Sequence, residues 1–121
     1  MPDVDDLFAE LRQLLTRHAG LLNVVRDEPD DVQLETTKSG PSGTPLPFGS
    51  VQSHEQHVSF QLMPVYSHPD LLADISDALR AQLQGKSCFD LTPEIATPEL
   101  VAELSALVDA GLARYRADRL A

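Results

Sequence analysis

The sequence is poor in cysteine, aromatic residues and basic residues, and each shortage excludes a class of protein. Cys88 is the only cysteine, so no disulfide can form within the chain. Tryptophan is absent and aromatic residues make up 5% of the chain, so the core must be built mainly from leucine, valine and alanine. Nine basic residues stand against nineteen acidic ones, for a net charge of -10. This balance argues against nucleic acid and anionic membranes as partners, because both attract clustered lysine and arginine.

Long apolar runs are also missing. No stretch is long enough to span a bilayer, and the N-terminal sequence MPDVDDLFAELRQLL is acidic and amphipathic, unlike a secretory signal. A lone cysteine fits a reducing compartment. We therefore expect a cytoplasmic protein. The length of 121 residues suits one domain over residues 1–121. On folding, a chain of this length can bury roughly two-thirds of the surface that the unfolded chain exposes, so it needs no metal or disulfide for stability.

Amphipathic helices are predicted at both ends of the chain. Asp3 is placed to cap the first helix and Gly20 to end it. Thr97 and Pro98 form a strong helix start for the second. The apolar stripes of the two helices are Leu7, Phe8, Leu11, Leu14 and Leu15, and Leu100, Val101, Leu104, Leu107, Val108 and Leu112. We expect both stripes to pack on one face of a sheet, with Leu11, Leu104 and Leu107 nearly inaccessible to solvent.

The segments between these helices have the composition of strands and turns. Strands are predicted over residues 21–26, 32–39, 47–53 and 57–66. Pro29 favours a turn over Asp27–Asp31, and Gly40–Pro45 has the composition of a loop. Gly49 is a candidate bulge, and Pro64 indicates an edge strand or the fraying end of one.

Two short helices and a last strand complete the prediction. One helix is expected near Pro69–Ala73 and a second, carrying Leu79 and Leu83, is expected to end at Gly85. Ser87–Leu91 is the last strand, and we expect it to lie beside the strand over residues 57–66. The predicted fold class is α+β: an antiparallel sheet of about five strands with the terminal helices on one face, in the order α-β4-α-β-α.

Four short motifs in the second half of the chain, with the helix that follows them, resemble the YdhG-like family of uncharacterised bacterial domains. The motifs are MPVY (Met63–Tyr66), P-x-L-L (Pro69–Leu72), I-S-x-x-L (Ile75–Leu79) and GK-x-C-F (Gly85–Phe89). The family is grouped loosely with frataxin-like folds. The resemblance implies a helix–sheet–helix domain and no particular reaction.

The chain also departs from the family pattern. Gln56 and His57 stand where a basic residue often precedes the strand, and Gln61 stands where histidine is frequent. An anion-binding role for these three positions therefore does not carry over to this chain.

The predicted topology suggests one ligand site. If the strands over residues 57–66 and 87–91 are neighbours, Tyr66, His68, Lys86 and Ser87 come near one rim, each with a polar tip. Met63 would supply a flexible apolar wall. The alternative reading of Gly85 and Lys86 is structural, as a helix C-cap and a charge that complements the helix dipole.

Metal binding is the weaker hypothesis. His54 and His57 flank a predicted hairpin turn and could share a metal, but two ligands on a turn are fewer than a site requires. Asp27, Asp30 and Asp31 lie in the first predicted turn without the spacing of a calcium-binding loop. A solvated turn explains both groups, so we expect no metal and no cofactor.

No catalytic motif stands out. The sequence around Cys88 contains no motif that would supply a general base or lower the pKa of its thiol. The expected function is a non-enzymatic small-ligand or protein-binding module. The alternatives are a frataxin-like protein that handles iron and an acidic, secretion-chaperone-like dimer that binds peptides. A pocket lined by polar groups favours the first, converging carboxylates the second and a long apolar groove the third. A homodimer is compatible with any of them.

Overall fold

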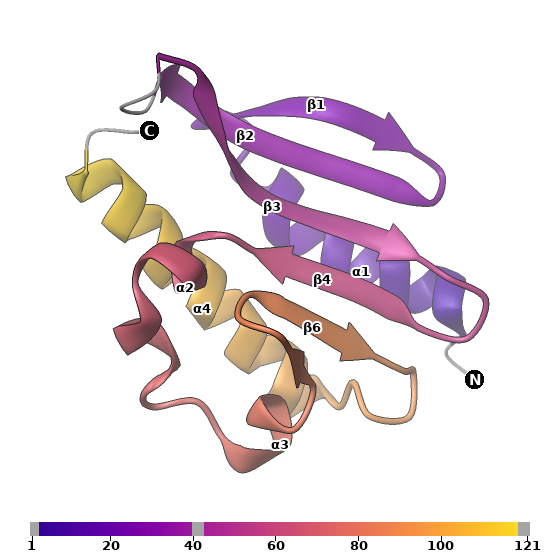
Figure 1. The fold of residues 1–121 in the computed structure, drawn as a ribbon. Helices are drawn as coiled ribbons and strands as arrows, with labels where there is room; N and C mark the ends of the chain where they lie inside the picture. The colour runs from indigo at the N-terminus through magenta and orange to yellow at the C-terminus, as the bar shows by residue number, and fades with distance from the viewer. Residues whose placement is uncertain (1–2, 40–42, 119–121) are drawn as a thin grey trace.

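The computed structural model describes residues 3–39 and 43–118, and places an antiparallel sheet in front of two long helices (Figure 1). The strands are β1 (Leu22–Glu28), β2 (Asp31–Ser39), β3 (Pro45–Ser53), β4 (Val58–Leu62), β5 (Leu83–Gln84) and β6 (Cys88–Leu91). The helices are α1 (Val4–Thr16), α2 (Pro64–Ser67), the 3-10 helix η1 (Pro69–Leu72), α3 (Asp77–Arg80) and α4 (Pro98–Ala117). The predicted loop residues 40–42 lie outside the described part of the chain.

The terminal helices begin at the predicted caps. Asp3 accepts a hydrogen bond from the amide of Asp6 at 2.8 Å, and Thr97 accepts one from the amide of Leu100 at 3.2 Å. Arg17, just beyond α1, ties the two helices together through a 2.6 Å ion pair with Asp109 of α4. The bonds to Asp3 and Thr97 satisfy amides that a helix leaves free in its first turn.

The sheet has six strands in the order β1-β2-β3-β4-β6-β5, and all its pairs are antiparallel. β6 returns beside β4, with Phe60 opposite Phe89 and Val58 opposite Leu91. This confirms the predicted neighbourhood of the two strands, and the α+β fold class is confirmed with it. The additional strand, β5, is two residues long and pairs only with β6 among the described residues.

The core lies between the sheet and the helices. Leu11 and Leu104 are fully buried and Leu107 is 6% exposed, so the predicted burial of all three is confirmed. The sheet contributes alternate residues, among them Phe60 and Phe89, as the period of a strand requires. The opposite face of β3 and β4 carries hydroxyl and amide side chains: Ser50, Gln52, Ser59 and Gln61.

Two predicted boundaries were wrong. The strand predicted over residues 57–66 ends at Leu62, because Pro64 has no amide hydrogen for a ladder and instead occupies the first turn of α2. The helix predicted to carry both Leu79 and Leu83 ends at Arg80, and Leu83 pairs with Phe89 as part of β5. Gly85, with φ 74°, occupies the turn between β5 and β6 rather than the end of a helix.

Gly49, the predicted bulge, lies next to the irregularity that the structure shows in β3. Leu34 pairs with Gly49 and Glu35 with Pro47, so Phe48 is the extra residue on that strand. A Cβ atom at Gly49 would stand 3.0 Å from the carbonyl oxygen of Gln61 and 3.1 Å from the Leu15 side chain. A side chain at this position would require the Gln61 carbonyl or the Leu15 side chain to shift by a few tenths of an ångström, so glycine suits the close approach of α1 to the sheet. In the described part of the chain, no helix is long and apolar enough to cross a membrane.

Candidate functional site

A pocket of about 520 Å³ lies where α2 and η1 face the β5–β6 turn. Its walls are mainly apolar and come from three elements: Val65 of α2, Pro69 and Leu72 of η1, and Leu83 of β5. Val65 is 1% exposed, while Leu72 and Leu83 are half-buried and pack against the main core. The pocket is therefore an extension of the core that remains open at the surface.

Tyr66 and Lys86 form the polar rim of this pocket. The Lys86 ammonium lies 5.8 Å from the centre of the Tyr66 ring, a cation–π distance, and the Tyr66 side chain is 54% exposed. Lys86 forms no ion pair with a carboxylate among the described residues. In a chain of net charge -10, Lys86 thus places a positive charge at the rim of a mainly apolar pocket.

The other three residues of the predicted site lie elsewhere. Ser87 is buried, and its carbonyl oxygen accepts a 2.9 Å hydrogen bond from the amide of Leu62, so it supports the sheet and does not line the rim. Met63 lines a separate hollow of about 130 Å³ on the polar face of the sheet. His68 turns toward α4. The predicted rim is thus reduced to Tyr66 and Lys86.

Polar contacts hold the pocket wall against α4. Arg114 donates to both carboxylate oxygens of Asp70 in η1, and its guanidinium lies 3.5 Å from Nδ1 of His68. Nε2 of His68 lies 2.8 Å from Asp118. Because Arg114 only donates, Nδ1 of His68 must accept, and Nε2 must carry the hydrogen that Asp118 receives. The hydrogen bond from Arg114 lowers the pKa of Asp70.

A second set of bonds holds the far end of the same segment. Glu103 of α4 accepts from the Ser76 amide at 2.5 Å and from the Ser76 hydroxyl at 2.7 Å. Arg80 donates to the carbonyl oxygen of Leu72 at 2.7 Å. The wall formed by η1 is therefore positioned by side chains of α3 and α4, which the sequence pattern could not place.

The candidate metal ligands do not converge. His54 and His57 do face each other across the β3–β4 turn, with ring centres 4.4 Å apart and planes inclined by 16°. A metal binds a ring nitrogen in the plane of the ring, so stacked rings direct their lone pairs along parallel lines rather than to one point. Nε2 of His54 is instead bonded to the Ser59 hydroxyl at 3.0 Å.

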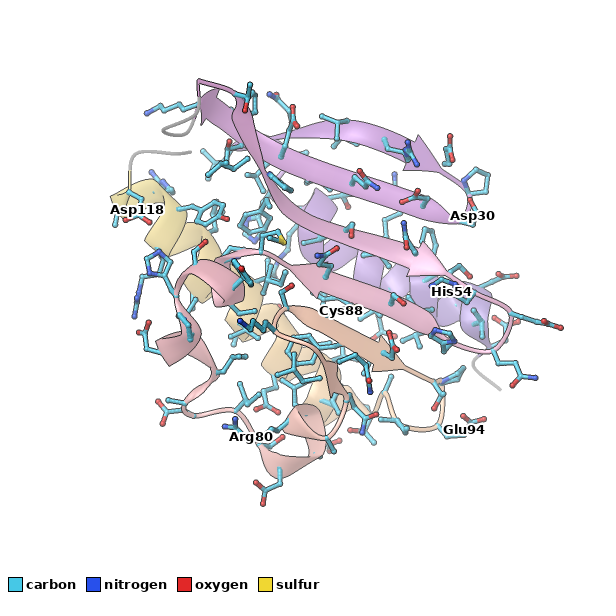
Figure 2. The ribbon with its side chains drawn as sticks, in the orientation of Figure 1. Asp30, His54, Arg80, Cys88, Glu94 and Asp118 are labelled. Carbon is cyan, nitrogen blue, oxygen red and sulfur yellow. The ribbon has the colours of Figure 1, made fainter. Side chains whose placement is uncertain are left out.

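The acidic residues of the first turn have other partners. Asp27 pairs with Arg12 and Asp31 with Arg26, each at 2.8 Å, while Asp30 is exposed. The described residues contain no group of three or more His, Cys, Asp or Glu side chains placed to hold a metal ion. Figure 2 shows Asp30 at the β1–β2 turn and His54 near the same end of the sheet.

The polar face of the sheet carries a hydrogen-bonded row that the sequence did not reveal. The Ser59 hydroxyl donates to Asp90 at 3.0 Å, and the Cys88 thiol lies 3.8 Å from the same carboxylate oxygen. Because the only hydroxyl hydrogen of Ser59 goes to Asp90, His54 must donate to Ser59. A nucleophilic triad needs the opposite arrangement, with histidine between serine and aspartate. Burial, together with the nearby charge of Asp90, raises the pKa of Cys88, which disfavours a reactive thiolate.

A wider hollow of about 680 Å³ lies at the other end of β6. Its lining includes the carboxylates of Asp3, Asp90 and Glu94 with His57, and no lysine or arginine. Asp3 already caps α1 and Asp90 already accepts from Ser59. Figure 2 places Glu94 at the opposite end of the molecule from Asp118.

Comparisons with protein-family models, curated proteins and solved structures find no match for this chain. The resemblance to the YdhG-like domains therefore stays a prediction from the sequence motifs.

Proposed function

We propose that this chain is a non-enzymatic binding module that holds a small anionic ligand in the pocket between α2, η1 and the β5–β6 turn. The observation that carries the proposal is Lys86: an ammonium without a carboxylate partner among the described residues, at the rim of a 520 Å³ pocket. That volume lies within the roughly 300–1,000 Å³ that is typical of small-molecule sites. Tyr66 supplies an exposed ring beside the charge.

The non-enzymatic part of the proposal is supported by the polar row on the sheet. Ser59 gives its hydrogen to Asp90, and the pKa of Cys88 is raised, so neither side chain is prepared as a nucleophile. The two alternative functions have less support. Asp27 and Asp31 are each paired with an arginine, and the polar face of β3 and β4 offers no long apolar groove in the described residues.

The test is a titration of the labelled protein with acetate, benzoate and inorganic phosphate, followed by amide NMR shifts. We expect the amides of Gly85 and Lys86 to move first with at least one anion, and Lys86→Ala to abolish the shift. Lys38→Ala is the matched control, because Lys38 is also an exposed lysine without an ion pair among the described residues but lies on β2, away from the pocket. A spectrum that stays unchanged with all three anions would refute the proposed site.

A further inference from the structure

We infer that the ligand of this pocket is an amphipathic monocarboxylate, with an apolar tail inside the pocket and its carboxylate at Lys86. The inference rests on the proposed function and specifies the chemical class that the site takes. It follows from the contrast between the interior of the pocket and its rim.

The interior accepts only an apolar group. Val65, Leu72 and Leu83 come from three different elements and line a space beside the core, which Val65 belongs to and the two leucines pack against. The pocket is lined by no acidic side chain, and Lys86 is its only basic one. A polar tail in this space would lose its hydrogen bonds to water without replacement, whereas an apolar tail gains from leaving water.

The rim accepts one negative charge. Lys86 is a point charge with three donors, and the pocket holds no arginine that could bind a phosphate in two-pronged fashion. The helix beside it, α2, has four residues and begins with a proline, so it adds no row of free amides. The net charge of -10 opposes any multiply charged anion as it approaches. A carboxylate fits these conditions and a phosphate dianion does not.

The Tyr66 ring fixes where the head group lies. Its centre is 5.8 Å from the Lys86 ammonium, and more than half of the side chain is exposed. A cation over an aromatic face at an exposed site gains only about 0.5–1 kcal/mol, so a carboxylate can replace or share this contact. The ring then covers the first carbons of the tail, which places the carboxylate at the surface and the tail toward Leu72.

The experiment is a calorimetric and NMR titration with butanoate, hexanoate and octanoate, each compared with the alcohol of the same length. We expect affinity to rise roughly fourfold for each added methylene until the pocket is full. Octanoate should bind at least tenfold more tightly than octanol. Lys86→Met should remove that preference while leaving octanol binding unchanged, and Lys38→Met should leave both unchanged.

A further titration with peptides distinguishes two sources of the carboxylate, the C-terminus of a peptide chain and a small carboxylic acid. A tripeptide ending in leucine, with a free C-terminus, presents the same chemistry as 4-methylpentanoate, and its amidated form removes the charge. Tighter binding of the free tripeptide than of 4-methylpentanoate assigns the site to chain ends; the reverse assigns it to small carboxylic acids. Both results support the amphipathic class.

Three other outcomes would overturn the inference in distinguishable ways. If acetate and phosphate shift the Lys86 amide but affinity does not grow with chain length, the anion site stands and the apolar tail is wrong. If octanol binds as tightly as octanoate to the wild-type protein, the head group is wrong. If no anion or carboxylate shifts Gly85 or Lys86, the proposed function fails along with the inference.

Discussion

The sheet with its two terminal helices and the short helix η1, in the connection from β4 to β6, are held in place by different forces. In the first region, Leu11, Phe48 and Leu104 are fully buried, and the contacts between layers are apolar. In the connection, η1 has no buried residue, and its position depends on the bonds that join Asp70 to Arg114 and Ser76 to Glu103. The pocket lies within the connection, between its helical part, α2 and η1, and the strand β5, which pairs with β6 of the sheet.

This difference indicates which contacts of the molecule are easier to break. Apolar contacts in the core are lost only when a whole layer separates. An exposed ion pair contributes little to the free energy of unfolding, and its two charged groups readily bind water instead of each other. η1 has no buried residue and should therefore be displaced more easily than β5, whose Leu83 pairs with Phe89 in the sheet.

The largest effect is expected from truncating the core. Leu104→Ala should lower the free energy of unfolding by about 2–5 kcal/mol, because it removes apolar contacts and leaves a cavity. Leu72→Ala, on the half-buried wall of the connection, should cost about 1 kcal/mol or less. Urea unfolding followed by circular dichroism measures both. Equal losses for the two variants would contradict the division into a core and a loosely held connection.

The sequence predicted the first region better than the second. The stripes of α1 and α4 and the alternation in β2 and β4 are local patterns that report burial directly. Asp3 and Thr97 marked the helix starts because capping depends on nearest neighbours. The two-residue β5 has no periodicity to detect, and its existence depends on pairing with Phe89 and Cys88 across a turn.

The candidate site was predictable only in part, for the same reason. Tyr66 and Lys86 were expected together because each borders a predicted element, and the β4–β6 pairing brings those elements together. Ser87 was expected at the rim because its side chain is polar, but it is buried, on the same side of the chain as Phe89 and Leu91. His68 was misplaced because its partner, Asp118, is far along the chain.

The second-largest effect is expected where Pro64 of α2 meets Gly111 of α4. This contact between the connection and α4 is called the seam. A Cβ atom at Gly111 would lie 2.9 Å from Cβ of Pro64, so Gly111→Ala must push α2 away from α4. Alanine in an open helix position would stabilise by about 1 kcal/mol, but here we expect a net loss of about 1–3 kcal/mol from overpacking.

Gly20→Ala is the matched control for this seam, because a Cβ atom at Gly20 meets nothing within 4 Å. It should leave the free energy of unfolding unchanged or raise it slightly. Thermal unfolding of both variants measures the difference. A Gly111→Ala protein as stable as the Gly20→Ala protein would mean that α2 yields at no cost, and that the seam belongs to the loosely held region.

The smallest effect is a pH dependence confined to the connection. Hydrogen bonds from Arg114 lower the pKa of Asp70 from its ordinary value of 3.8. Because the pKa is lower in the folded state, the Asp70–Arg114 pair stabilises this segment at pH values above the pKa of the unfolded chain. That stabilisation is lost as the pH falls through the pKa of the folded state.

His68 and Asp118 also face Arg114, so Asp118→Asn serves as a control that keeps the Asp70–Arg114 pair. In acid titrations below pH 3.8, followed by NMR, the η1 amides should shift together with the Asp70 carboxyl carbon while the Leu104 amide stays unchanged. Asp70→Asn should abolish this transition and Asp118→Asn should retain it. Simultaneous shifts in η1 and α4 core amides would show that the two regions respond as one, and the comparison drawn here would be wrong.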